Sequence, residues 1–158
     1  MMNAKRLVWA GLLSLAVAVT PQAFSAEHAH EHGSHGSLSL ELNQGEKWKT
    51  DAPLRKGMET IRSEMAGHLG QIHSDSLAGA EYLTLANKVQ GQVQYMFANC
   101  ELPPSADAQL HILLARMLEG VEQMRSESGQ RQGAVQVVQA LGAYGDHFEH
   151  SGWQGLHH

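Results

Sequence analysis

The side chains in this sequence that could do chemistry are one thiol, a few thioethers and several imidazoles. Cys100 is the only cysteine, and Met58, His111, His147 and His150 each lie near the end of an expected helix. In a bundle of four helices that alternate in direction, those helix ends meet at one end of the bundle. Thiolate, thioether and imidazole are ligands of copper, zinc and haem iron. The sequence therefore predicts a metal site made of these five residues.

Four segments of the chain have apolar residues at spacings of three and four, which is the pattern of amphipathic helices. The first begins near Pro53, with Thr50 or Asp51 as its cap, and the others begin after residues 74–76, at Ser105 and after Gly129. The expected buried faces are Leu54, Met58, Ile61, Met65, Leu69 and Ile72; Tyr82, Leu85, Val89, Val93, Met96 and Cys100; Leu110, Leu114, Met117, Val121 and Met124; and Ala134, Val137, Val138, Leu141, Tyr144 and Phe148. Helices of about 18 to 22 residues with short connections favour an all-α, antiparallel up-down-up-down four-helix bundle. This bundle is expected to span residues 53–153, with a C-terminal tail at 154–158.

The last helix is expected to continue to His150 and to be closed by Gly152. His147 and His150 are three residues apart, so on a continuous helix they are close enough to share a metal. Histidine near a helix C-terminus is also favoured electrostatically without any metal. A solvated helix end is therefore the alternative for this pair.

Each of the other candidate ligands also has an ordinary structural explanation. Met58 suits a helical core, and Met96, one turn before Cys100, has a similar claim to be a ligand. Cys100 could be a small buried apolar residue. Asp107 precedes His111 by one turn, so its carboxylate could orient the imidazole of a metal site or form a surface ion pair. Only the convergence of the helix ends favours coordination.

The N-terminus has the pattern of a secretory signal peptide over residues 1–26. Lys5 and Arg6 precede a short apolar run, and small residues at 23 and 25 suit cleavage. The run is too short to span a bilayer, and no later segment is long enough, so the mature protein is expected to be periplasmic or secreted. Removing the signal leaves nine basic residues against 16 acidic ones, a formal charge of −7. That sign argues against nucleic acid or an anionic membrane surface as a partner.

Residues 27–52 are expected to be a flexible histidine-rich segment followed by an extended strap. The tract EHAHEHGSHGS has no apolar side chain large enough to fold around, and tracts of this kind collect Zn²⁺, Cu²⁺ or Ni²⁺. Its histidines, expected to capture metal for the bundle, are His28, His30, His32 and His35. A solvated polar tail is the alternative. The strap after residue 38 is expected to pack against the bundle through Trp48.

The motifs of the common enzyme classes are missing from the sequence. There is no G-x-S-x-G, no phosphate-binding loop and no dinucleotide fingerprint. There is no C-x-x-C-H for covalently attached haem, and no pair of E-x-x-H motifs for a di-iron site. We therefore expect a protein that is not an enzyme.

The segment Gly57-Met58-Glu59-Thr60-Ile61-Arg62 resembles the start of cytochrome b562, a periplasmic four-helix bundle. In that family a methionine at this place and a histidine late in the last helix are the axial ligands of haem b. The resemblance implies Met58 and, in the segment AYGDH, His147 as the corresponding ligands. It does not account for Cys100, His111 or the histidine-rich tract.

Three functions follow from these patterns. The first is an exported protein that buffers copper or delivers it to a protein partner, with zinc as the other ion that Cys and His ligands suit. The second is a b-type haem protein that transfers electrons, for which Ala134, Ala140, Gly142 and Ala143 would make room. The third is a bundle without a cofactor that binds a protein partner through an aromatic rim of Trp48, Phe97 and Trp153.

Overall fold

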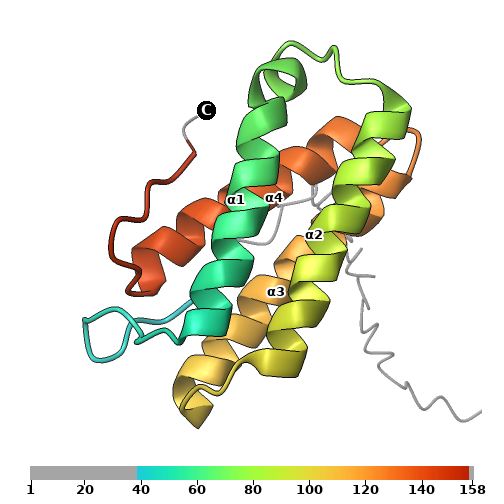
Figure 1. Cartoon of the computed structure of the whole chain (residues 1–158). Helices are drawn as coiled ribbons and strands as arrows, with labels where there is room; N and C mark the ends of the chain where they lie inside the picture. The colour runs from blue at the N-terminus through green and yellow to red at the C-terminus, as the bar shows by residue number, and fades with distance from the viewer. Residues whose placement is uncertain (1–38, 157–158) are drawn as a thin grey trace, which may run out of the picture. The chain divides into compact units, whose positions relative to one another are not determined.

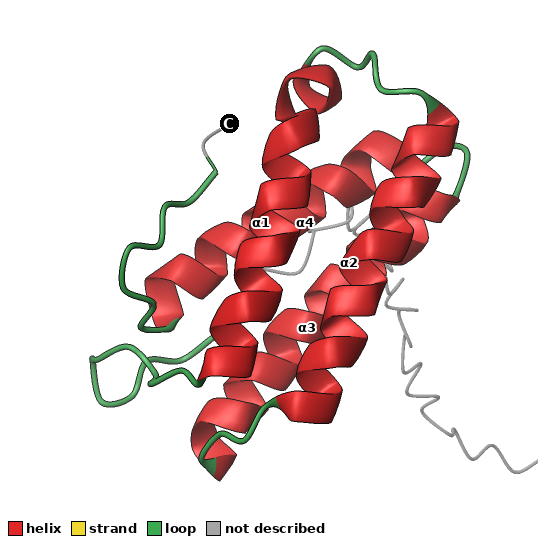
Figure 2. Cartoon of the chain, viewed as in Figure 1, coloured by secondary structure: helices red, strands yellow, loops and turns green. Residues whose placement is uncertain are grey.

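The computed structural model describes residues 39–156, and this part of the chain is helical (Figure 1). The four helices are α1 (Ala52–His73), α2 (Gly79–Asn99), α3 (Pro104–Arg125) and α4 (Gln130–His147). Within residues 39–156 there is no strand, only two isolated β-bridges (Figure 2). The prediction of an all-α protein with four helices is confirmed. The expected signal peptide, the histidine-rich tract and the final His157-His158 lie outside the described residues.

None of the helices within the described range is long and apolar enough to cross a membrane. Each helix buries the face that its periodicity predicts, and of the residues expected there only Leu69 and Cys100 are partly exposed. Helices that follow one another in the chain pack together, and α4 also packs against α1 and α2. Figure 1 shows α1 and α2 running side by side while α4 crosses them at an incline. The apolar core therefore lies between all four helices.

The helix boundaries follow from local chemistry. The Asp51 carboxylate accepts the Leu54 N–H at 2.8 Å and so caps α1, with Pro53 in the first turn. The Glu81 carboxylate accepts the Ala78 N–H at 3.1 Å at the start of α2. Proline occupies the first position of α3, after a second proline that has no N–H to continue α2. These ends agree with the predicted ones to within a few residues.

The end of α4 differs from the prediction. The helix stops at His147, and Phe148 is extended (φ −119°, ψ 138°) because it pairs with the strap. Trp48 N–H donates to the His147 carbonyl at 2.8 Å, and Glu149 N–H donates to the Trp48 carbonyl at 2.8 Å. The expectation that His147 and His150 are three residues apart on one helix is therefore wrong. A pairing between residues 100 positions apart overrides the local helical pattern.

The closest approach between helices is the crossing of α3 and α4 at two glycines. A Cβ on Gly133 would overlap the Gly120 carbonyl oxygen and lie 2.6 Å from the Met124 nitrogen, and a Cβ on Gly120 would lie 2.8 Å from the Gly133 oxygen. Beside this contact the buried Gln136 donates to the Arg116 carbonyl at 2.9 Å and accepts from Gln123 at 3.2 Å. The backbones touch here, so the crossing requires glycine.

We expect Gly133→Ala to destabilise the protein by about 1–3 kcal/mol, because the methyl group would push α4 away from α3. Gly142→Ala is the matched control on the same helix, since a Cβ there meets nothing within 4 Å. It should raise stability by up to about 1 kcal/mol through helix propensity. Urea unfolding followed by circular dichroism measures both. Equal effects of the two substitutions would contradict a close helix crossing at Gly133.

Candidate metal centre

Three of the four helix ends predicted to meet are joined by the Asp51 carboxylate and the strap. One Asp51 oxygen caps α1, and the other accepts the Glu101 N–H at 2.7 Å, from the connection between α2 and α3. The Thr50 hydroxyl donates to the Glu149 carbonyl at 2.6 Å, just after α4. The N-terminal end of α1 is therefore joined to the C-terminal ends of α2 and α4.

A cavity of about 220 Å³ opens at this end between α2 and α3. It is lined by Met96, Phe97, Cys100, Asp107, Leu110, His111 and Leu114. The structure thus brings Cys100 and His111 to one cavity, together with Met96 and the Asp107 side chain. Met58, His147 and His150 do not line it.

Cys100 terminates α2 and is partly buried. Loss of hydration raises the pKa of its thiol to about 12, and the Asp51 charge, a hydrogen bond to Asp51 and the Asp107 charge act in the same direction. The thiol is therefore protonated at neutral pH, which makes it a poor nucleophile. A metal ion that binds the thiolate would have to displace this proton.

His111 is exposed, and its ring is oriented by its own helix and by one neighbour. Its Nδ1 lies 2.9 Å from the Asp107 carbonyl oxygen and 3.4 Å from the Asp107 carboxylate. Its ring packs against Phe97 at 5.2 Å between centroids. With Nδ1 donating to Asp107, Nε2 carries the lone pair that a metal needs. Asp107 stands in the position predicted for a carboxylate that orients the imidazole.

Met96 is the methionine that lines the cavity with Cys100 and His111. Its Sδ packs on the α1 backbone, 2.7 Å from where a Cβ on Gly57 would lie, and its side chain also lines the cavity. Both methionines are buried, with 0% of Met58 and 1% of Met96 exposed, and Met58 does not line the cavity. From the sequence, Met58 and Met96 are similar candidates for a metal ligand, and Met96 differs only in lying one turn before Cys100. A role for Met96 as a ligand would require its sulfur to turn from Gly57 to the cavity.

The two histidines after residue 146 make other contacts. His147 Nδ1 lies 2.9 Å from the Ala143 carbonyl oxygen. His150 Nδ1 lies 3.1 Å from the Tyr144 hydroxyl, and its ring packs on Trp153 at 5.1 Å between centroids. Burial lowers the pKa of His150, which favours the neutral imidazole. His150 therefore belongs to an aromatic cluster with Tyr144 and Trp153, whereas His147 bonds to its own helix.

The aromatic rim expected to form a partner surface is only partly exposed. Trp48 and Trp153 are half-buried and pack against the core, whereas Phe97 is 49% exposed. Among the small residues expected to make room for haem, Ala134 and Ala140 are buried core residues. The haem interpretation itself stays a prediction.

Within residues 39–156, no three His, Cys, Asp or Glu side chains lie close enough together to hold one metal ion. The possible donors that line the cavity are one thiol and one imidazole, together with the side chain of Met96. Zinc sites are almost always four-coordinate, whereas thiolate and thioether ligands select Cu(I). These residues fit Cu(I) better than zinc.

No known protein family, curated protein or solved structure matches this chain. The resemblance to cytochrome b562 therefore rests on the two short segments at Gly57–Arg62 and Ala143–His147.

We expect Cys100 to react with iodoacetamide at pH 8 roughly 100- to 1000-fold more slowly than an unperturbed thiol, because its pKa of about 12 leaves little thiolate. Asp51→Asn should speed the reaction, since it removes a negative charge next to the thiol and keeps a good helix cap. Mass spectrometry of timed samples measures the rates. Asp146→Asn, an exposed carboxylate on α4, is the control and should change nothing. A wild-type rate equal to that of the urea-unfolded chain would contradict the raised pKa.

Proposed function

We propose that this protein is an exported metal-binding protein that holds Cu(I) at the α2–α3 end of the bundle and buffers it or delivers it to a protein partner. The observation that supports this proposal is that Cys100 and His111 line one cavity of about 220 Å³ with Met96. Cys100 and His111 are two of the five ligands that the sequence predicts. The other three, Met58, His147 and His150, do not line this cavity. The histidine-rich tract at 27–37 is proposed to capture metal for this site.

The chemistry of the cavity suits a soft ion. Cys100 supplies a thiolate once its proton has left, His111 supplies Nε2, and Met96 supplies a thioether. The Asp107 carbonyl oxygen lies 2.9 Å from His111 Nδ1 and orients the imidazole, so less side-chain entropy is lost when the metal binds. The neighbouring carboxylates Asp51 and Asp107 favour a bound cation electrostatically, although they also hold the thiol proton.

Binding should be strongly pH-dependent. Because the pKa of Cys100 is about 12, one proton must leave the thiol for each Cu(I) bound at neutral pH. The apparent affinity should therefore rise about tenfold for each pH unit between pH 7 and 9. An imidazole-only site, such as the histidine-rich tract, has no thiol proton to release and would lack this dependence.

The test is a Cu(I) competition titration against a chromogenic chelator, on mature protein lacking residues 27–37. We expect one equivalent of Cu(I), with affinity reduced at least about tenfold by Cys100→Ala and by His111→Gln. Met96→Leu should weaken binding less, because a thioether is a weaker ligand than a thiolate. Sulfur coordination should also appear in the X-ray absorption spectrum of the bound metal.

Two matched controls separate coordination from folding. His68 Nδ1 lies 2.8 Å from the Glu64 carbonyl oxygen, the same bond to its own helix that His111 makes, so His68→Gln should leave the affinity unchanged. Met65 is a completely buried methionine elsewhere in the core, so Met65→Leu serves as the control for Met96→Leu. Binding that survives Cys100→Ala at full affinity would refute the site, and a Soret band in the purified protein would favour haem instead.

A further inference from the structure

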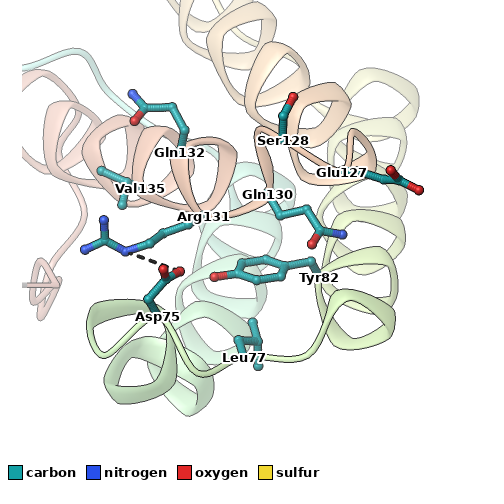
Figure 3. Close-up of a pocket in the computed structure, with 9 residues that line it drawn as sticks. All are labelled: Asp75, Leu77, Tyr82, Glu127, Ser128, Gln130, Arg131, Gln132 and Val135. Atoms are coloured by element: carbon teal, nitrogen blue, oxygen red, sulfur yellow. Dashed lines mark ion pairs between the residues drawn. The ribbon is translucent and has the colours of Figure 1, made fainter.

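A second and larger cavity lies at the opposite end of the bundle. It has a volume of about 410 Å³ and is formed by the connection between α1 and α2, the first turn of α2, the end of the α3–α4 connection and the start of α4 (Figure 3). Its lining is mainly polar, and it includes Asp75, Tyr82, Glu127, Ser128, Gln130 and Arg131. Nothing in the proposed copper site uses these residues.

The Tyr82 hydroxyl is the first reason to infer a ligand here. The residue is only 3% exposed, and among the described residues its oxygen has no hydrogen-bond partner. Figure 3 shows the Tyr82 ring lying across the cavity, with its hydroxyl directed toward Asp75. Burial raises the pKa of Tyr82, and the Asp75 charge does so too, so the hydroxyl remains a neutral donor. An unpaired buried hydroxyl is unfavourable, and a bound polar group would relieve that cost.

Arg131 adds a positive charge to the same cavity, on the other side of Asp75 from this hydroxyl (Figure 3). Its Nε donates to the Ile72 carbonyl at 2.9 Å and one Nη donates to the His73 carbonyl at 3.4 Å, at the C-terminal end of α1. A guanidinium group has five N–H donors, so these two bonds leave donors for a ligand. Nε is also 4.0 Å from the Asp75 carboxylate, which is too far for a strong ion pair.

The start of α4 adds a second positive feature. No side chain caps this helix, and the helix dipole favours an anion at its start. The cavity is also lined by Asp75, whose carboxylate lies toward the Tyr82 hydroxyl in Figure 3, whereas the Glu127 carboxylate points away. A simple anion would be repelled by the Asp75 carboxylate, and a simple cation by Arg131. A molecule that carries both charges would pair with Arg131 through its negative group and with Asp75 through its positive group.

We propose that this cavity binds a free α-amino acid. Its carboxylate would be held by Arg131, the Tyr82 hydroxyl and the start of α4, and its ammonium group by Asp75. The Gln130 side chain is held by the Gly79 carbonyl at 3.3 Å and forms a polar wall beside Tyr82. The cavity volume is in the range of small-molecule sites. This site is independent of the copper site at the other end.

The test uses the mature protein and a panel of the twenty L-α-amino acids at millimolar concentration, screened by thermal shift and then by ¹H–¹⁵N correlation spectra. At least one amino acid should raise the melting temperature and shift amides within residues 74–82 and 127–135. Acetate and methylammonium carry only one of the two charges, so each should bind roughly tenfold more weakly or worse. Failure of every amino acid to bind would overturn the proposal and leave a cavity filled by water.

Two conservative variants test the residues that carry the proposal. Tyr82→Phe removes only the unpartnered hydroxyl, so the melting temperature should not fall while amino-acid affinity drops roughly tenfold. Asp75→Asn removes the charge, and asparagine tolerates the positive φ of +53° at this position. Tyr95→Phe, the same change on the opposite end of α2, is the control and should bind normally. Unchanged affinity in both site variants, or equal binding of acetate, would overturn the proposal.

Discussion

The Asp51 carboxylate is the interaction on which the candidate metal centre depends. It accepts the N–H of Leu54 at 2.8 Å and of Glu101 at 2.7 Å, so one side chain satisfies backbone donors from two separate parts of the chain. Its negative charge also helps to raise the pKa of the Cys100 thiol. The start of α1 and the end of α2 are therefore held together by a group that also controls the thiol. Any change in the ionisation of Cys100 acts on the same carboxylate that orders both helix ends.

This arrangement explains how a single thiol can persist in an oxidising compartment, if the protein is exported as its sequence predicts. Thiols are oxidised as thiolates, and burial together with the Asp51 and Asp107 charges keeps the pKa of Cys100 at about 12. In the proposed function a soft cation would replace this proton and would be attracted by the same carboxylates. The charges that keep the thiol neutral in the free protein would then also favour the bound ion.

The sequence predicts the helices and their buried faces well because apolar spacing is a local property. Leu54, Ile61, Val89 and Leu141, for example, are buried as their spacing predicts. The sequence misplaces His150 because Phe148 pairs with Trp48, a contact between distant segments that no local pattern reveals. It cannot choose between Met58 and Met96, because that choice depends on which methionine lines the cavity between α2 and α3. The contact of Gly120 with Gly133 and the cavity beside Tyr82 also arise only when separate helices meet.

The two ends of the bundle differ in chemistry because their helix termini carry different side chains. The end near Asp51 collects sulfur and imidazole between α2 and α3, whereas the end near Arg131 collects charged and amide groups around an uncapped helix start. Helices of 22 residues, such as α1 and α3, are about 33 Å long, so the two ends are separated by most of the core. Substitutions that far apart and without shared partners have additive effects. The core between the two ends is closely packed. Correct folding of a variant at one end can therefore be checked by measuring the site at the other end.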